Sequence, residues 1–523
     1  DKDEMENNLG TICKSGSLQF KKDMEKQDDI DIIGQFGVGF YSAFMVADTV
    51  TVISRKYGSD EAWKWTSSGA DGYTMEPAER ESAGTDVIMT LKADTEDEQY
   101  SRFLKTWELQ KLVKKYSDYI RYPIKLEMEK SRMKEETKDS DKPEYETYTE
   151  NETLNSMVPL WQRAKKDITP EEYNNFYKEK FFDFEDPVAT IHVSVEGAVT
   201  YKALLYIPAR APYDFYTKDF KKGLQLYSSG VMIMENCADL LPDCFRFVRG
   251  VVDSQDLSLN ISREMLQHDR QLKFIAGNLE KKIKSELQKL MDNDREKYEK
   301  FFAAFGPQIK YGVLADYGAK KETLQDLLLY WSSKEGKLIS LKEYAAAMPE
   351  DQKYIYYANG ESREALHQLP QMEKLQQKGC DVLFMTDEVD GFVPQTLGKY
   401  QEKEFKSVTA GDLGLETEEE KKAAEEKSEK SKQTLDFVKK TLGDKIKEVR
   451  LSDNLGSHPV SVIPAEGMTF EMEKYFKRVD PNSGMKAERI LELNADHPIF
   501  AKLQIAVAQD EKKAEDLVKI LYT

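Results

Sequence analysis

Three glycines within six positions form the most specific local pattern of the sequence, Gly34-Gln-Phe-Gly-Val-Gly-Phe40. Glycines let the backbone turn tightly and come close to a ligand. The apolar stretch that follows is predicted to form a helix ending near Ala47. Free N–H groups at the start of a helix favour an anion, and phosphate in particular. The pattern therefore predicts a phosphate-binding loop, with a tight turn packed on a buried helix as the alternative.

The segment just upstream, Asn7–Gly16, places polar side chains between two glycines. Asn8 is suited to bond a sugar hydroxyl, and Lys14 is suited to meet a phosphate. Gly10 and Gly16 are spaced to let the piece between them swing, which predicts a mobile lid beside the loop. The alternative is a capped surface helix with ordinary turns.

A sheet is expected to position these residues. Four β-branched and aromatic runs, separated by Gly, Asp and Ser turns, predict strands. The runs are Thr49–Ser54, Ala62–Ser67, Gly72–Met75 and Thr85–Lys92. One apolar stripe predicts a helix after them. Its residues are Phe103, Leu104, Trp107, Leu112, Val113, Tyr116 and Ile120. Together they predict an α/β unit with an antiparallel sheet.

The rest of the chain divides by changes in pattern. Residues 129–152 are charged and aperiodic, which predicts a linker. Four strands are predicted next, at Val188–Val195, Tyr201–Ile207, Leu224–Met234 and Phe245–Val251. A long helix should follow, with apolar residues recurring every three or four positions. These are Leu272, Ile275, Leu279, Ile283, Leu287 and Leu290.

A smaller unit follows, with a parallel β-α-β pattern in which a right-handed crossover is expected. It consists of Tyr354–Ala358, Ser362–Gln377 and Cys380–Met385. Glu416–Lys432 predicts a solvated helix, and a last α+β block has strands near Ile446–Leu451, Val460–Ile463 and Arg489–Leu493. The fold class is therefore multidomain, α/β and α+β. The expected domains are 1–128, 153–330, 331–410 and 434–523, with connectors at 129–152 and 411–433.

Composition excludes several classes of protein. Lys and Arg number 76 against 95 Asp and Glu, so the net charge of −19 argues against general nucleic-acid binding. Four scattered cysteines and five histidines show no disulfide framework and no zinc spacing. No apolar run reaches the roughly 18–20 residues of a membrane span. A cytoplasmic location is expected, without membrane partners.

Several motifs together resemble one family, the heat-shock protein 90 chaperones. Asn7–Gly16, Gly34–Ser42 and Gly84-Thr-Asp-Val resemble its ATP-binding domain. Further family signatures follow in order. They are Leu204-Leu-Tyr-Ile-Pro-Ala-Arg-Ala-Pro, Arg246-Phe-Val-Arg-Gly-Val-Val-Asp-Ser and Leu259-Asn-Ile-Ser-Arg-Glu-Met-Leu-Gln. The resemblance covers essentially the whole chain, and the short linker resembles the bacterial form of the family.

The resemblance implies an ATPase of the gyrase and histidine-kinase group, with ATP and Mg²⁺ as cofactors. It implies that part of the ATP-binding α/β sandwich lies in 1–128, that the middle domain occupies 153–410, and that the C-terminal domain occupies 434–523. It gives nucleotide contacts to Asn8, Lys14, Gly34, Gln35, Phe36, Gly37, Val38, Gly39 and Phe40, and puts Thr85 at the adenine side.

The resemblance also implies that Arg263 reaches the terminal phosphate, with Gln267 assisting. A planar, permanent guanidinium charge suits a γ-phosphate. Without the resemblance, a local ion pair of Arg263 with Glu264 or Asp269 is the alternative.

The sequence departs from the family pattern at its start. The glutamate that activates water, the asparagine that binds Mg²⁺ and the Asp-x-Gly-x-Gly turn have no counterpart here. This chain is therefore expected to be a poor ATPase, and a nucleotide-independent holdase or inactive fragment is the alternative function. Family dimers form through helices expected beyond Thr523. A gyrase-like DNA enzyme is disfavoured by the net charge.

One segment near the C-terminus predicts client binding. Its methionines and aromatics suit an adaptable surface for non-native chains. The residues are Met468, Phe470, Met472, Tyr475 and Phe476. Family members use an amphipathic segment near this place, whereas a core-facing helix is the alternative.

Overall fold

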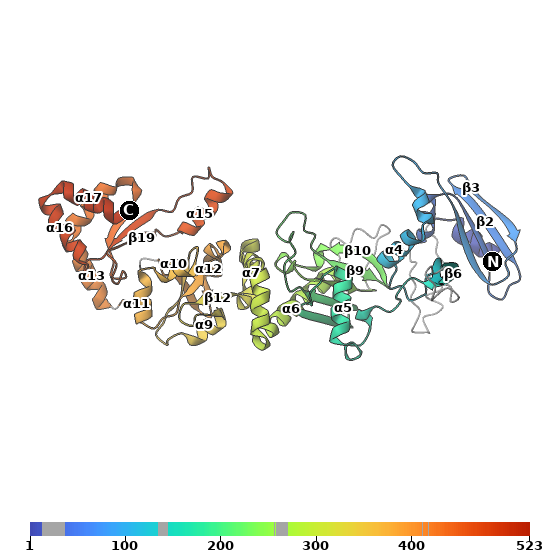
Figure 1. Cartoon of the computed structure of the whole chain (residues 1–523), viewed down its shortest axis with the longest axis horizontal. Helices are drawn as coiled ribbons and strands as arrows, with labels where there is room; N and C mark the ends of the chain where they lie inside the picture. The colour runs from blue at the N-terminus through green and yellow to red at the C-terminus, as the bar shows by residue number, and fades with distance from the viewer. Residues whose placement is uncertain (13–36, 134–144, 256, 258–269, 410–411, 417) are drawn as a thin grey trace, which may run out of the picture. The chain divides into compact units, whose positions relative to one another are not determined.

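The computed structural model describes residues 1–12, 37–133, 145–255, 257, 270–409, 412–416 and 418–523 (Figure 1). The chain forms two compact units. Unit 1 comprises Asp1–Pro208, Tyr216–Pro242 and Val248–Glu280. Unit 2 comprises Ala209–Phe215, Asp243–Phe247 and Lys281–Thr523. Helices and sheets mix in both, which confirms the predicted multidomain α/β and α+β class, while the finer domain boundaries stay predictions.

The first sheet of unit 1 is antiparallel, as predicted. Its order is β3 (Gly72–Ala78), β2 (Ala62–Gly69), β1 (Ala47–Arg55) and β4 (Gly84–Leu91). Helix α1 (Lys2–Leu9) packs Met5 against Val50 and Trp65 of this sheet. Asp1 and Glu4 form a capping box that fixes where the helix starts.

The helix predicted from Phe103 to Ile120 is shorter and broken. A 3₁₀ helix, η2 (Tyr100–Leu104), ends where Lys105 takes an extended backbone, and α4 (Thr106–Tyr116) begins after it. Trp107 and Leu104 are largely exposed. The seven apolar residues do follow a stripe, but the residues that the structure describes bury none of them fully.

The charged segment predicted as an aperiodic linker contains a hairpin. Strands β5 (Lys125–Met133) and β6 (Tyr145–Thr153) pair antiparallel. Lys130 Nζ lies 3.1 Å from Glu150 and 3.2 Å from Glu152 on the opposite strand. Lys130 is directly paired with Tyr148, and Glu150 is its diagonal neighbour on β6. Opposite charges on neighbouring cross-strand positions stabilise a strand pair. The mixed charges of this segment show no apolar alternation, so the strand pairing could not be predicted from the sequence.

The second sheet of unit 1 forms the large middle part. Its order is β10 (Val231–Cys237), β9 (Leu224–Ser228), β11 (Arg249–Asp253), β8 (Tyr201–Ile207) and β7 (Ala189–Val195). The single strand predicted at Leu224–Met234 is wrong, because the chain turns back at Ser229 and Gly230, both with positive φ. The strand predicted from Phe245 starts only at Arg249.

A buried histidine links this sheet to α5 (Pro170–Phe181). His192 Nε2 lies 3.1 Å from the Trp161 carbonyl, so Nε2 carries the proton and donates it. Nδ1 then accepts from the Tyr173 hydroxyl at 2.7 Å. Burial lowers the pKa of His192, the Trp161 carbonyl opposes this, and Lys165 and Lys202 lower it further.

We expect this histidine to make unit 1 less stable in acid. A lowered pKa means that the unfolded chain takes up a proton near pH 6.5 that the folded chain resists. The free energy of unfolding should therefore fall as pH drops through that value. His192→Gln should weaken the dependence, measured as amide-exchange protection of β7 and β8 between pH 7.5 and 5.5. His367→Gln, an exposed control in unit 2, should leave it unchanged.

A long helix passes from unit 1 into unit 2, and it confirms the predicted stripe. Helix α6 (Arg270–Asn293) buries five of the six predicted residues. They are Leu272, Ile275, Leu279, Ile283 and Leu287, with Met291 buried in place of Leu290. Helix α7 (Arg295–Gly318) follows and is buried along much of its length.

The predicted parallel β-α-β unit lies in a six-stranded sheet of unit 2. Its order is β13 (Leu338–Ser340), β12 (Leu329–Ser332), β15 (Leu383–Met385), β14 (Tyr354–Asn359), β17 (Lys403–Ser407) and β16 (Lys399–Tyr400). Strand β14 is parallel to both β15 and β17. The predicted single helix is two, α10 (Arg363–His367) and α11 (Gln371–Gln377), separated around Pro370.

The last block is α+β, as predicted. Strands β18 (Glu448–Leu451), β20 (Arg489–Leu493) and β19 (Val460–Pro464) form its sheet. Its helices are α13 (Glu418–Lys430), α14 (Lys432–Leu442), α15 (Phe470–Val479), α16 (Pro498–Gln509) and α17 (Glu511–Tyr522). Leu435, Leu491 and Leu503 lie in its core. None of the helices in the described ranges combines the length and apolar character of a membrane span.

Candidate functional site

The described part of the glycine segment is a tight turn. Gly37 has a φ of 64°, which favours glycine. The 3₁₀ helix η1 (Gly39–Ser42) and α3 (Ala43–Val46) follow, and Ala47 already belongs to β1. The predicted helix is present, but it is a single turn and none of its residues is buried. Phe40, Ala43 and Phe44 nevertheless pack against the core of the first sheet. A phosphate-binding loop and a tight turn packed on a helix therefore both stay predictions.

This short helix changes the argument for anion binding. A helix macrodipole is the sum of aligned peptide dipoles, and a single turn contributes few of them. Most of the attraction expected for an anion must therefore come from the backbone amides of the loop. The first helical bond runs from the Tyr41 N–H to the Val38 carbonyl, at 3.1 Å. The amides of Gly39 and Phe40 precede it and lie at a helix start, where N–H groups have no intrahelical acceptor. An added Cβ at Gly39 would meet no atom of the described residues within 4 Å, so none of those residues covers this side of the turn.

The structure brings the glycine turn and α1 together. The Tyr41 hydroxyl donates to the Leu9 carbonyl at 2.8 Å. Phe40 packs edge-on against Trp65, with ring centroids 5.7 Å apart. Asn8 lies in the last turn of α1 and is exposed. Asn8 and Phe40, both predicted as nucleotide contacts, are thus carried by elements that touch each other.

Thr85 lies elsewhere on the same sheet. It is exposed on β4 and pairs with Ser54 of β1, where the two hydroxyl oxygens are 2.7 Å apart. Phe40 of the glycine turn packs on Trp65, and the strand partner of Trp65 is Val52, two residues before Ser54 on β1. The place of Thr85 at the adenine side stays a prediction. The other predicted nucleotide residues lie outside the described ranges, namely Lys14, Gly34, Gln35, Phe36, Arg263 and Gln267.

The predicted client-binding segment is α15 with the residues before it. Thr469 caps the helix by accepting the Met472 N–H at 3.2 Å. Met472 is buried, whereas Met468, Phe470, Tyr475 and Phe476 are half-buried. In this structure the apolar face of α15 is covered rather than open to solvent.

A short segment after β15 covers that face, and sequence analysis did not single it out. It comprises the 3₁₀ helix η9 (Glu388–Gly391) and α12 (Val393–Leu397), with Phe392 between them. The Phe392 ring lies 5.3 Å from Tyr475 and 5.9 Å from Phe476, centroid to centroid. The available signal was Phe392 itself, an aromatic residue directly after an acidic turn.

A buried ion pair holds η9 in place. Lys310 Nζ of α7 lies 2.8 Å from both Asp387 and Asp390. Burial alone would lower the pKa of Lys310, but the two carboxylates outweigh it and raise that pKa. The Lys310 amine also sits 4.7 Å from the Tyr330 ring centroid. The segment that faces α15 is thus anchored to the interior of unit 2.

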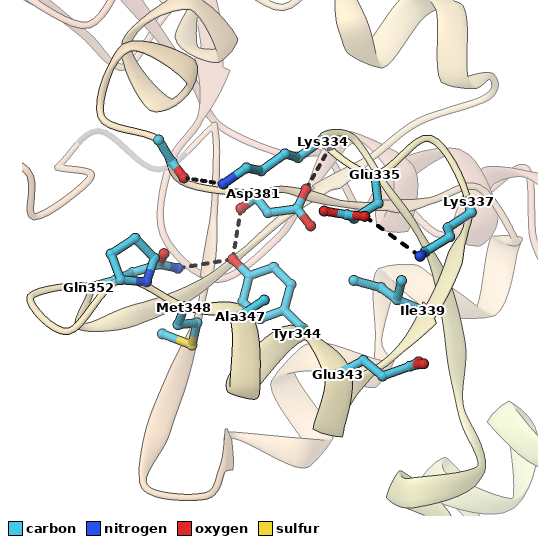
Figure 2. A pocket seen from close by; sticks show the side chains of 12 residues that line it. Lys334, Glu335, Lys337, Ile339, Glu343, Tyr344, Ala347, Met348, Gln352 and Asp381 are labelled. Atoms are coloured by element: carbon cyan, nitrogen blue, oxygen red, sulfur yellow. Dashed lines mark hydrogen bonds and ion pairs between the residues drawn. The ribbon is translucent and has the colours of Figure 1, made fainter. Parts of the chain in front are cut away.

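The six-stranded sheet of unit 2 also borders a cavity of about 260 Å³ (Figure 2). Figure 2 shows Tyr344 and Asp381 at its wall, where the Tyr344 hydroxyl donates to the Asp381 carbonyl at 2.7 Å. The Asp381 carboxylate accepts from Ser332 and Ser333. None of the predicted site residues lines this cavity. Because these polar groups are already bonded within the fold, we assign the cavity no chemistry.

Comparison with known proteins places the chain in a family. A family model described as Hsp90 protein matches residues 134–523. Chaperone protein HtpG of Clostridium acetobutylicum is 55% identical over 521 residues, covering 100% of this chain and 82% of that protein. Chaperone protein HtpG of Bacillus subtilis is 53% identical over 521 residues, covering 100% and 83%. Chaperone protein HtpG of Clostridium perfringens is 54% identical over 519 residues, covering 99% and 82%. The chain therefore belongs to the Hsp90 family, and within it to the bacterial type.

Proposed function

We propose that this protein is an ATP-dependent molecular chaperone that clamps non-native client proteins through a nucleotide-driven conformational cycle. The observation that carries the proposal is 55% identity along the whole chain to a protein named as a chaperone. The match covers 100% of this chain, and so includes the glycine turn, the middle sheets and α15, which supports the same overall activity.

ATP with Mg²⁺ is the proposed cofactor. Gly37 to Phe40 supply backbone amides at a turn whose Gly39 side none of the described residues covers, which suits a phosphate tail. Asn8, on the adjoining helix, is proposed to bond the nucleotide, and Lys14 with Gly34, Gln35 and Phe36 to complete the cradle. Thr85 is proposed at the adenine side. Arg263 is proposed to contact the terminal phosphate, with Gln267 assisting. ATP, when bound, supplies the phosphoanhydride bond whose hydrolysis resets the clamp.

Unfolded or partly folded proteins are the proposed partners, bound through the residues of α15 and its surroundings. A homodimer in the cytoplasm is proposed for the complete protein. The net charge of −19 supports a role that does not involve nucleic acid.

A nucleotide-independent holdase is the second candidate. It is favoured by one observation: the contacts that α15 makes with η9 and Phe392 lie within unit 2, distant in sequence from the glycine turn. Client binding at α15 could therefore operate without nucleotide.

One assay separates the two. Heat-aggregating citrate synthase is mixed with the protein in the presence of ATP, of a non-hydrolysable ATP analogue, or of no nucleotide, and light scattering is followed. We expect protection together with slow phosphate release, and a difference between ATP and the analogue. Equal protection in all three conditions would replace the proposal with the holdase, and absence of any protection would overturn both.

A further inference from the structure

Unit 2 contains a crevice at the carboxyl ends of two parallel strands. Strand β14 is followed by α10 and α11 on the way to β15, which lies on one side of it. Strand β15 is followed by η9 and α12 on the way to β17, on the other side of β14. The segments that follow these two strands, together with α15, line a crevice at this edge of the sheet. Ligands of open α/β sheets commonly bind outside the carboxyl ends of the strands. The crevice has a volume of about 250 Å³.

The strand ends make this crevice acidic. Glu361 follows β14, while Asp387 and Glu388 follow β15, and all three line it. Asp387 is engaged by Lys310 from behind, at 2.8 Å. Glu361 and Glu388 are therefore the two strand-end carboxylates that can pair with the cations of a bound segment.

Helix α15 enters this crevice with a basic face. Lys474 Nζ lies 2.8 Å from Glu361, and the Arg478 guanidinium bonds both oxygens of Glu388. Residues four apart lie on one side of a helix, so Lys474 and Arg478 point the same way. Tyr475, between them, packs on Phe392. The residues with which α15 contacts this crevice are therefore a lysine, the aromatic residue next to it and an arginine one helical turn after the lysine.

The fit of α15 is incomplete. The side-chain nitrogen of Asn359, at the wall of the crevice, is buried and has no hydrogen-bond acceptor among the described residues. The side chains of all four ion-pair partners are more than half exposed. Exposed ion pairs are weak, and a buried donor without an acceptor costs free energy while α15 is seated. Another segment of the same chemistry can therefore displace α15.

We propose that this acidic crevice is a docking site for short basic amphipathic segments, that α15 occupies it in cis, and that Lys/Arg-aromatic segments of clients compete with α15 for it. The client part rests on the proposed chaperone function. The site itself rests on the charges, on its place at the carboxyl ends of two parallel strands and on the contacts of α15 with it.

The test uses a fluorescent peptide with the sequence of residues 467–480, titrated into the whole chain and followed by anisotropy. In the unchanged protein α15 competes, so binding should be weak. Lys474→Glu with Arg478→Glu should expel α15 and tighten peptide binding at least tenfold. Adding Glu361→Lys and Glu388→Arg should remove that binding. A peptide with Glu at the Lys474 and Arg478 positions should not bind the Lys474→Glu/Arg478→Glu protein.

Two controls keep the outcome interpretable. Lys486→Glu with Lys512→Glu makes the same charge change at exposed positions and should leave peptide binding as in the unchanged protein. Amide exchange of α15 should quicken in Lys474→Glu/Arg478→Glu and slow again in the fourfold variant, where the reversed charges can pair anew. Equal peptide binding by the unchanged and double variants, or exchange that does not recover, would overturn the proposal.

A final measurement tests client competition separately from the chaperone function. Reduced, carboxymethylated α-lactalbumin, an unfolded client, should displace the peptide from the double variant. Displacement supports client competition. Peptide binding without displacement removes the client part, whereas the chaperone function is judged independently by protection of citrate synthase.

Discussion

Replacement of Lys310 by methionine should lower the local stability of unit 2 by about 3–5 kcal/mol, because it leaves a fully buried carboxylate without its partner. The Asp390 side chain is completely buried, and Lys310 is its cationic neighbour at 2.8 Å. Burial already raises the pKa of Asp390, with Lys310 opposing the shift. Hydrogen-exchange protection of β12 and β15 amides measures the loss.

A neutral partner should recover part of that stability. In Lys310→Met with Asp390→Asn no fully buried charge remains, since Asp387 is partly exposed, and the amide oxygen can still accept the Asp387 N–H, now at 3.0 Å. Lys289→Met is the matched control, because this lysine is mostly exposed and its removal should change stability by no more than about 0.5 kcal/mol. A Lys310 variant as stable as that control would show that the buried pair does not hold η9.

Strands could be predicted from the sequence where buried and exposed residues alternate and where turn residues mark both ends of the strand. In β1, Val50 and Val52 alternate with less buried residues, and the predicted strand matches. The prediction was wrong for Leu224–Met234, where a hairpin is hidden in continuous apolar sequence. An added Cβ at Gly230 would come within 2.2 Å of the Tyr119 carbonyl, so this glycine is required by a contact distant in sequence.

The candidate sites also differ in how far the sequence alone could predict them. A glycine turn and a methionine-aromatic helix are local patterns, so sequence alone could single out both as candidates. The acidic crevice is not local, since Glu361, Glu388 and Arg478 come from three separate segments. Their individual types are unremarkable for a chain with 33% charged residues. Only the parallel pairing of β14 with β15 brings the first two together.

The buried ion pair and the crevice share one element. Lys310 holds η9 through Asp387 and Asp390, while Glu388 in the same turn meets Arg478. A change that loosens η9 should therefore also loosen α15. This gives Lys310→Met a second expected signature, faster amide exchange in α15, which Lys289→Met should lack.

Arg263→Ala should lower ATP turnover of the complete natural protein by roughly 10²-fold or more, with little loss of fold, because a guanidinium beside a terminal phosphate stabilises charge that develops in the transition state. Its proposed role comes from the family motif, and it lies shortly before the start of α6. Alanine removes the charge and the planar donor set together. Phosphate release under saturating ATP measures the effect on turnover, and nucleotide titration measures binding separately.

Arg270→Ala is the matched control for that variant. Arg270 is the first residue of α6 and is exposed, so it shares the region and charge of Arg263 without the proposed contact. A loss confined to Arg263→Ala, with nucleotide affinity changed less than turnover, places the guanidinium at the reacting phosphate. Equal losses in both variants would instead indicate a general effect of positive charge near the start of α6. Unchanged turnover in Arg263→Ala would remove this residue from the mechanism.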